Sequence, residues 1–461
     1  MLTLREVAAW VEEPEPYLRH FGSDEMVLRA KQTLARRVFD TFEENFPSSP
    51  RREVAVTFVP GRVEVLGKHT DYAGGHSLLM AVDRGFIALS ALNEEGCIRM
   101  VEDDPAYGSC EFEFRPDLEP PLGHWSNYPM TMAKRLAANF GREHPWRGVD
   151  IAFGCDLPVG GGMSGSSAFM IMTFFALALP NRLWENEKFR RNIRNNLDLA
   201  MYLACAENGQ TFRELEGSKG VGTFGGSEDH TEILNARPGM FSLFEFCPTV
   251  HKADLSVPPE WVVVIGYSGV RAEKTRAALE KYNLVSRRAR LAVEAYNRRY
   301  GTNFTLLREL GGEPAEQVEA ALEAADREQP TLKLRARYRQ FAAENWEIIP
   351  AVAQALLMRD EAALGALIDR SHELSRECLG NIVPEIDFLQ RKAREWGALA
   401  ASGFGAGFGG SLYAIVEQSQ AEEFCERWQQ AYQEQFPAAR TQAYFFSTRP
   451  AGSACELFVP P

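Results

Sequence analysis

The sequence predicts an α+β protein built from two domains. Short runs of β-branched and aromatic residues, separated by Gly, Asn and Asp, fill residues 53–114 and are typical of strands and hairpins. Helical periodicity precedes this region, and later segments alternate strand-like with helical patterns. With 461 residues the chain can hold two hydrophobic cores. We place an N-terminal domain at residues 1–235 and a C-terminal domain at residues 236–461.

Each expected element follows from a local pattern. Residues 1–46 predict an N-terminal helical cover, in which Ser23 is the expected cap of the helix that ends before PSSPRR. The other expected elements are, in chain order, strands in EVAVTFV, RVEVL, GFIALSAL and SCEFEF, a helix near 125–140, the strand GVDIAFGCDLP, an apolar helix after Ser164, the helix FRRNIRNNLDLAMYLACAENG, the strand WVVVIGYS, long helices over 273–300 and 332–370, and the strand SLYAIV.

Composition and charge narrow the class of partner. Hydrophobic residues make up 45% and charged residues 25% of the chain, as in ordinary globular proteins, and the net charge of −13 argues against nucleic acid or an anionic membrane. The longest apolar run, at 168–179, is too short to cross a bilayer and predicts a buried helix. No signal sequence is recognisable, and the eight cysteines lack metal-binding spacing. We therefore expect a cytoplasmic protein with a small-molecule partner and no zinc site, as a monomer or weak homo-oligomer.

The stretch GRVEVLGKHTDYAGG, residues 61–75, resembles a P-loop but does not fit one. A P-loop has four residues between its glycines and Ser or Thr after the lysine, whereas five residues separate Gly61 from Gly67 and His69 follows Lys68. The alternation in RVEVL favours a strand instead.

The segment DLPVGGGMSGSSAF, from Asp156 to Phe169, has the composition of a phosphate-binding loop. Its glycines let the backbone approach an anion, and the start of the following helix presents N–H groups to negative charge. Ser164, Ser166 and Ser167 can add hydroxyl groups. The alternative is a glycine-rich turn that leads into a core helix capped by serine.

Three motifs in this order resemble those of the GHMP small-molecule kinases, and within them the galactokinases. PGRVEVLGKHTDYAGG is similar to the galactokinase signature, LPVGGGMSGSSA to the ATP-phosphate loop of the family, and GFGAGFGG (403–410) to its C-terminal glycine loop. The resemblance covers roughly residues 50–416. It implies a two-domain GHMP kinase fold with the active site in the cleft between domains, and transfer of a phosphate from ATP to the C1 hydroxyl of a sugar.

The resemblance also implies roles for individual residues. Asp229 matches the catalytic aspartate and Arg62 the active-site arginine, a pairing that suits proton acceptance and charge balance in phosphoryl transfer. Glu207 and Ser166 match the residues linked to Mg²⁺. The implied sugar-binding and ATP-binding residues are, for the sugar, Lys68, His69, Asp71 and Tyr282, and for ATP, Trp125, Tyr128, Gly160, Gly161, Gly162, Ser164, Gly165, Ser166 and Ser167.

Several residues depart from the galactokinase pattern. Glu64 stands in place of an asparagine, and Ser402 and Phe404 in place of a basic residue and a threonine. Lys68 replaces the glutamate that contacts the C6 hydroxyl of the sugar, so it reverses the charge there. Lys68 could face the substrate, face solvent, or neutralise nearby carboxylates.

The leading hypothesis is an ATP- and Mg²⁺-dependent sugar 1-kinase that acts on galactose or a close relative. One alternative is a galacturonate 1-kinase, in which Lys68 pairs with the C6 carboxylate. The other is a sugar sensor that binds ATP and sugar but has little activity. The presence of Arg62, Asp229 and the serine-rich loop favours the enzyme.

Overall fold

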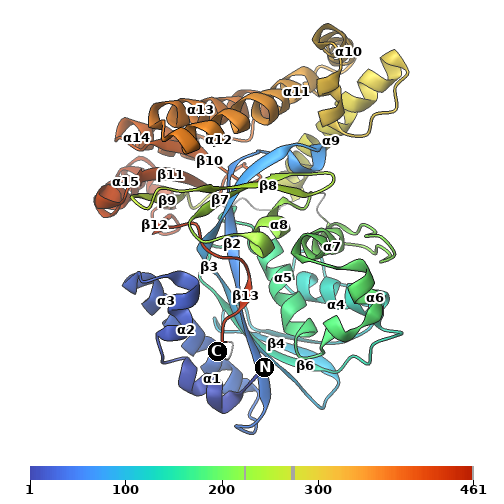
Figure 1. Ribbon diagram of the computed structural model, residues 1–461, viewed down its shortest axis with the longest axis vertical. Coiled ribbons are helices and arrows are strands. Elements are labelled where there is room, and N and C mark those ends of the chain that lie inside the picture. Colours follow the sequence, from blue (N-terminus) through green and yellow to red (C-terminus); the bar gives the residue numbers. More distant parts are fainter. Residues whose placement is uncertain (223–224, 271–275, 459–461) are drawn as a thin grey trace.

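The computed structural model describes residues 1–222, 225–270 and 276–458, and for residues 276–282 the backbone alone. Two sheets form the framework and helices cover both (Figure 1). The N-terminus lies at the lower end of the larger sheet, and most helices after residue 276 lie at the top of the view. The predicted mixture of helices and strands is confirmed.

The larger sheet has nine strands, and all its pairings are antiparallel except that of β4 with β6. Its main path runs β1-β2-β3-β6-β4-β5, while β13 pairs with β2 and β7 pairs with β3 and β8. Its strands are β1 (Leu2–Thr3), β2 (Glu53–Leu66), β3 (His76–Leu92), β4 (Cys97–Glu102), β5 (Ser109–Glu113), β6 (Val149–Cys155), β7 (Met240–Glu245), β8 (Val250–Ser256) and β13 (Cys455–Glu456).

Strand β2 joins two runs that were expected to be separate strands, EVAVTFV and RVEVL. Its register against β3 shifts between Pro60 and Arg62 and again between Glu64 and Leu66. Proline has no N–H group for the ladder and is tolerated at such irregularities, which bend a strand and redirect its side chains. Arg62 and Glu64 therefore lie between two irregularities, two residues apart, where alternation places them on the same face.

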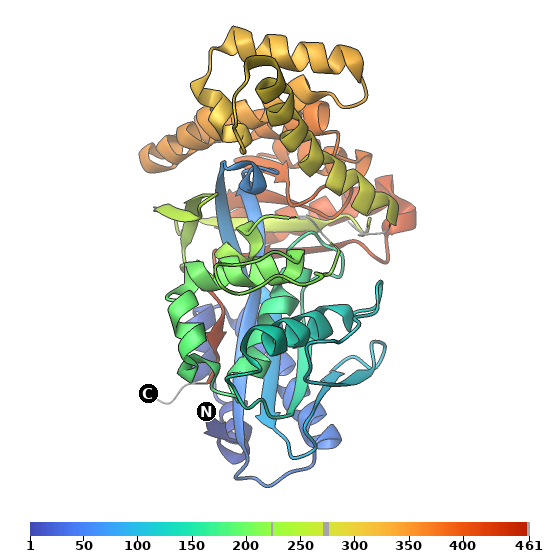
Figure 2. The same cartoon turned by 90° about the vertical axis from the view of Figure 1, so that its right-hand side faces the viewer.

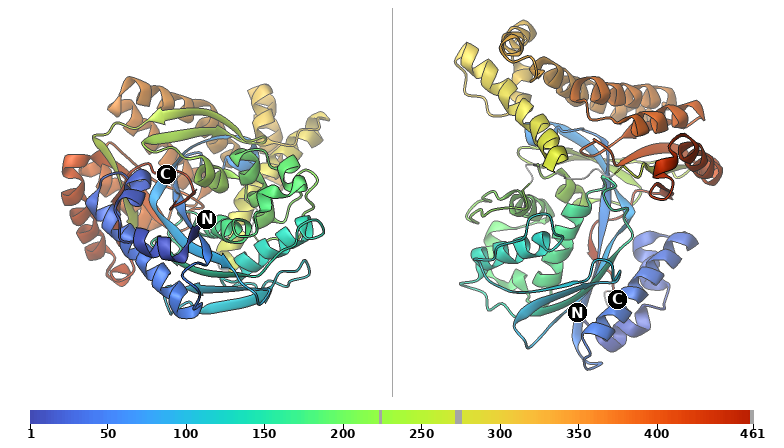
Figure 3. Two further views of the ribbon diagram at one scale, coloured as in Figure 1. Left: turned by 60° about the horizontal axis from the view of Figure 1, so that its bottom comes forward. Right: turned by 180° about the vertical axis from the view of Figure 1, so that it is seen from behind.

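Helices cover both faces of the larger sheet, as the view from behind in Figure 3 shows. One face carries α1 (Leu4–Trp10), α2 (Glu15–Phe21) and α3 (Glu25–Asn45), and the other carries α4 (Asn127–Phe140), α5 (Gly165–Ala178), α6 (Glu187–Asn192), α7 (Asn196–Asn208) and α8 (Glu228–Asn235). Asp24, and not Ser23, caps α3, because its carboxylate accepts the N–H groups of Met26 and Val27.

The apolar helix predicted after Ser164 is confirmed as α5, and all but three of its residues are buried. Within the part of the chain that the structure describes, no helix has both the length and the apolar character needed to cross a membrane.

The smaller sheet is antiparallel, with the order β10-β11-β9-β12. Its strands are β9 (Trp261–Tyr267), β10 (Ala400–Gly403), β11 (Ser411–Glu417) and β12 (Tyr444–Thr448). Strands β7 and β8 follow residue 236 yet belong to the larger sheet, and the division into domains at that residue stays a prediction.

The second half of the chain also supplies most of the helices around the smaller sheet and an arm that rises above it (Figure 2). These helices are α9 (Arg276–Tyr300), α10 (Ala315–Glu328), α11 (Leu334–Ala342), α12 (Ile349–Met358), α13 (Glu361–Leu374), α14 (Pro384–Glu395) and α15 (Ala421–Gln435), with short turns η3 (Leu307–Gly312), η4 (Ala343–Ile348), η5 (Ser375–Leu379), η6 (Gln418–Gln420) and η7 (Pro437–Ala439). The first half of the chain holds two further short turns, η1 (Asp71–Ala73) and η2 (Leu183–Glu185).

The single helix expected over residues 332–370 is wrong. A π-helical turn, η4, separates α11 from α12, and a break separates α12 from α13. At this break Arg359 has a left-handed φ of 54°, and the Asp360 side chain caps α13 by accepting the N–H of Ala363. Aspartate is more favourable at a helix cap than inside a helix, so α12 ends before Asp360 and α13 begins after it.

Candidate active site

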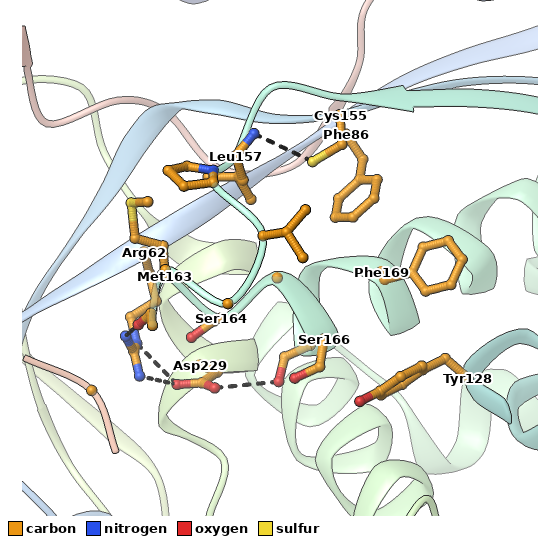
Figure 4. A pocket seen from close by; sticks show the side chains of 18 of the residues that line it. Arg62, Phe86, Tyr128, Cys155, Leu157, Met163, Ser164, Ser166, Phe169 and Asp229 are labelled. Carbon is orange, nitrogen blue, oxygen red and sulfur yellow. Dashed lines mark hydrogen bonds and ion pairs between the residues drawn. The ribbon is translucent and has the colours of Figure 1, made fainter. Parts of the chain in front are cut away.

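A cavity of about 800 Å³ collects side chains from both halves of the chain. Its walls come from β2, β3 and β6, the first turns of α5 and α8, the end of α7, and the loop 405–408 between β10 and β11. Figure 4 shows its centre, where Arg62 and Asp229 meet beside Ser164. The predicted site residues that line this cavity are Arg62, His69, Asp71, Trp125, Tyr128, Gly160, Gly161, Gly162, Ser164, Gly165, Ser166, Ser167, Glu207 and Asp229.

Arg62 and Asp229 form a close ion pair at the centre of the cavity. Asp229 Oδ1 accepts a hydrogen bond from Arg62 Nε at 2.9 Å and lies 2.6 Å from Arg62 Nη2. Arg62 Nη1 also donates to the carbonyl of Gly162 at 3.1 Å, which ties the pair to the glycine-rich loop. Burial alone would raise the pKa of Asp229, but the charge of Arg62 and the hydrogen bonds lower it below its usual range. Asp229 is therefore ionised at neutral pH.

The glycine-rich loop runs into an open helix start beside this pair. Gly160 and Gly162 have φ angles of 72° and 76°, which glycine adopts without strain. Ser164 precedes α5, but its side chain does not cap the helix. The expectation that a serine caps this helix is therefore wrong for Ser164. A Cβ atom added at Gly165 would meet no atom within 4 Å. The first turn of α5 therefore faces open space, an arrangement that suits an anion.

Ser167 connects two carboxylates behind the loop. Its Oγ is 2.9 Å from Glu207 Oε2 and 3.3 Å from Asp229 Oδ2. His230 Nε2 lies 3.2 Å from Glu207 Oε2. The family resemblance implies that Ser166, which also lines the cavity, provides the hydroxyl linked to Mg²⁺. It implies no role for His230. The only sequence feature that points to His230 is that it directly follows Asp229.

The end of the cavity next to β2 and η1 is polar. Glu64, His69, Asp71, Tyr72 and Glu228 line it. His69 Nδ1 is 2.9 Å from the Tyr72 hydroxyl, and burial together with nearby Arg337 lowers the pKa of His69 to about 4. Burial raises the pKa of Asp71 to about 6. This end thus offers a neutral imidazole and several carboxyl groups to a ligand.

The opposite end of the cavity is aromatic. Trp125 and Tyr128, which the sequence predicted there, are joined by Phe86, Phe153 and Phe169. The rings of Phe86 and Phe169 stack with centroids 5.3 Å apart. The three phenylalanines come from β3, β6 and α5, so only the tertiary fold identifies them as one surface. A flat aromatic base fits between such rings.

Lys68 is not among the residues that line the cavity. Its side chain is 1% exposed, so the solvent-facing alternative is wrong. Its Nζ donates to Ser371 Oγ at 2.9 Å, and that hydroxyl donates to Glu344 Oε1 at 3.0 Å. Its ammonium also lowers the pKa of Glu64, after the larger effects of burial and Arg62. Its contact with a substrate stays a prediction, as does that of Tyr282, whose side chain lies outside the described residues.

The two departures in the C-terminal glycine loop lie in the core. Ser402 is fully buried, and its Oγ donates to the carbonyl of Gly403 at 3.1 Å. Phe404 packs against Tyr413, with ring centroids 6.2 Å apart. The part of the loop that lines the cavity, residues 405–408, follows these two positions.

Three family models match the chain in sequence order. They are the galactokinase galactose-binding signature over residues 40–91, the GHMP kinases N terminal domain over residues 127–209, and the GHMP kinases C terminal model over residues 349–434. Over these three segments the chain is similar to the GHMP kinases, and over the first of them to the galactokinases. The first model covers Arg62 and, at the polar end of the cavity, Glu64, His69, Asp71 and Tyr72, and the second covers the glycine-rich loop.

The individual proteins that are similar to this chain over most of its length include galactokinases. The galactokinase of Roseiflexus sp. (strain RS-1) is 28% identical over 396 residues, which cover 85% of this chain and 90% of that protein. The galactokinase of Enterococcus faecalis (strain ATCC 700802 / V583) is 27% identical over 430 residues, which cover 93% of this chain and 100% of that protein. The crystal structure of Lactococcus lactis galactokinase complexed with galactose has a TM-score of 0.73 at 21% identity, and covers 90% of this chain and 98% of that one. The predicted galactokinase resemblance and GHMP kinase fold are confirmed.

Proposed function

We propose that this protein is a GHMP kinase that transfers the γ-phosphate of ATP to the C1 hydroxyl of galactose or a closely related sugar. The observation that carries the proposal is the ion pair of Arg62 with Asp229, which lies between the glycine-rich loop and the polar end of the cavity. A phosphate held at the loop and a hydroxyl held at the polar end would meet at this pair. The galactokinase relatives support the same activity.

Asp229 supplies the proton acceptor for this reaction. Its carboxylate is ionised at neutral pH and lies in the cavity wall, so it can accept the proton of a sugar hydroxyl that attacks the phosphate. Arg62 orients this carboxylate through two nitrogens and places positive charge where negative charge develops in the transition state. Phosphoryl transfer depends mainly on such positioning and charge stabilisation.

ATP fits the remaining length of the cavity. Its phosphates would lie against the first turn of α5 near Gly165, and its base among the aromatic rings around Trp125 and Phe169. Both ends of the nucleotide then have chemically matched surroundings. We also propose a cytoplasmic location, where ATP is available and where the eight unpaired cysteine thiols would stay reduced.

The donor set beside the loop fits Mg²⁺. Glu207, Ser166 and Asp229 offer hard oxygen atoms in the cavity wall. Across residues 1–222, 225–270 and 276–458 no group of three or more His, Cys, Asp or Glu side chains could hold a metal alone. This suits an ion that takes most of its ligands from phosphate and water, as Mg²⁺ does. When bound, Mg²⁺ would neutralise charge on the phosphates.

The polar end favours a neutral sugar over a uronic acid. Glu64, Asp71 and Glu228 line it and would repel a carboxylate wherever they are ionised. Lys68, the cation expected to attract a C6 carboxylate, points its ammonium to Ser371 instead. Galactose, the ligand of the Lactococcus structure, is therefore the first substrate to test.

Asp229→Asn tests whether the protein is an enzyme or a sensor. The variant should lower turnover about a hundredfold or more, because it removes the proton acceptor, while the dissociation constants for galactose and ATP change by less than about fivefold. Turnover is measured by ADP release and binding by calorimetry. Asp198→Asn is the control, since Asp198 pairs with Arg213 at 2.6 Å outside the cavity. A parent protein that binds galactose without consuming ATP would establish the sensor alternative.

A further inference from the structure

Glu64 is a buried carboxyl group at the polar end of the cavity, in a position where the similar galactokinase signature has asparagine. Its side chain lines the cavity and the residue is only 3% exposed. Its Oε1 atom is fully buried and has no hydrogen-bond partner among the residues that the structure describes. Burial of a polar atom without a partner is costly, and a ligand hydroxyl that donates to Oε1 would remove this cost.

Glu228 is the immediate partner of Glu64. Glu228 Oε2 accepts a hydrogen bond from Ser77 Oγ at 2.6 Å, and Oε1 is 3.7 Å from Arg62 Nη2. Burial, then the charges of Glu64 and Asp71, raise the pKa of Glu228 well above its usual range. A hydrogen bond between the side chains of Glu228 and Glu64 opposes the rise in the pKa of Glu64 that burial causes. The second oxygen of Glu64 is thus occupied by Glu228.

Other charges around Glu64 come from four elements. Arg62 lies on the same strand, Lys68 follows that strand, and Glu344 lies on η4. The two remaining charged groups around the pair are Asp71 of η1 and Asp229 of α8. The pKa of Glu64 is raised to about 7, because burial and the charge of Glu344 raise it by more than Arg62, Lys68 and the bond to Glu228 lower it. Glu64 therefore changes its charge near neutral pH.

We infer that Glu64 binds the sugar: its Oε1 atom accepts a hydrogen bond from a sugar hydroxyl, while Glu228 lies against the other oxygen of the carboxyl group. This inference rests on the proposed function, because it takes the polar end of the cavity as the sugar site. Arg62 and Asp229 then act on the hydroxyl that attacks the phosphate, and Glu64 accepts a hydrogen bond from a different hydroxyl on the same ring. Glu64 would be a specificity residue, since a sugar without that hydroxyl would leave Oε1 unpaired.

Binding of the sugar should therefore depend on pH. An ionised carboxylate accepts a stronger hydrogen bond than a protonated one. As pH falls from 8 to 6, Glu64 gains a proton, and galactose should bind about fivefold to tenfold more weakly. Glu64→Gln keeps the shape but has no charge to lose, so galactose should bind about tenfold to a hundredfold more weakly at pH 8 and show little change down to pH 6.

Calorimetric titration of galactose into the intact protein without nucleotide tests the inference separately from catalysis. The control is Glu102→Gln, because Glu102 also lines the cavity and burial also raises its pKa to about 7, but it lies away from the polar end. This variant should keep the affinity for galactose and its pH dependence. Thermal melting checks that each variant is folded, and the pH profile of the parent protein tests the inference if Glu64→Gln does not fold.

The outcomes separate the inference from the proposed function. Galactose binding that weakens at low pH in the parent and in Glu102→Gln, but not in Glu64→Gln, supports the inference even if no phosphate is transferred. A Glu64→Gln variant with the affinity and pH profile of the parent overturns it, as does a parent protein that binds galactose equally at pH 6 and 8 or not at all. Absence of phosphate transfer to bound galactose overturns only the kinase proposal.

Discussion

Replacement of Gly165 by valine should separate nucleotide binding from folding. Gly165 is the first residue of α5, and an added Cβ atom there meets nothing within 4 Å. The valine side chain would occupy the open space in front of the helix start, where we place the phosphates of ATP. The fold therefore has room for the valine side chain, but no room then remains for the phosphates of ATP.

The changes expected in stability and in the KM for ATP can both be given a size. Glycine and valine differ by less than about 1 kcal/mol in helix propensity, so the free energy of unfolding should change by no more than that. Displacement of the phosphates would break one or more hydrogen bonds to a charged group, each contributing about 1.5–3 kcal/mol. Since 1.4 kcal/mol is about tenfold, the KM for ATP should rise about tenfold to a hundredfold, and the KM for galactose less than about threefold.

Initial rates with each substrate varied in turn, together with thermal melting, measure these quantities. Gly312→Val is a matched control, because a Cβ atom at Gly312 also meets nothing within 4 Å and Gly312 does not line the cavity. Equal increases in both KM values, or loss of stability with an unchanged KM for ATP, would refute the phosphate-binding role and favour a purely structural turn.

Two further predictions concern buried charges. Lys68→Glu should lower the free energy of unfolding by about 3–5 kcal/mol in urea titrations, because it places a carboxylate beside Ser371 and Glu344 in a buried site, and it should not raise kcat/KM for galactose relative to galacturonate. A stable variant with a strong shift toward galactose would contradict this expectation and support a substrate contact of Lys68. Burial raises the pKa of Glu232 to about 8, so the folded state binds its proton more tightly and the resulting stability, on the order of 5 kcal/mol, is lost as pH rises from about 4.5 to 8. Glu232→Gln should flatten the melting temperature over this range, and an unchanged pH slope would contradict the assignment.

The centre of the site could be predicted from the sequence because short motifs specify it. The glycine-rich loop and α5 are adjacent in the chain, so the sequence already places Gly165 at a helix start. Arg62 and Asp229 are far apart in the chain, and only the family resemblance brought them together before the structure did.

The surroundings of the site could not be predicted, because they depend on packing between distant segments. The alternation in RVEVL suggested a strand, but not the two register shifts around Arg62 and Glu64. The family resemblance suggested a substrate contact for Lys68, but nothing in the sequence indicated that its ammonium donates to Ser371 of α13. The helix expected over 332–370 missed η4, the turn that brings Glu344 to the N–H of Gly67.

The central claim is most directly tested by identifying the product formed from galactose, ATP and Mg²⁺. Phosphorus and proton NMR of the reaction mixture should show one phosphate attached at C1 of galactose and an equal amount of ADP, with at least tenfold less product from galacturonate. A phosphate at any other position, ADP release without sugar phosphate, or a preference for galacturonate would contradict the account.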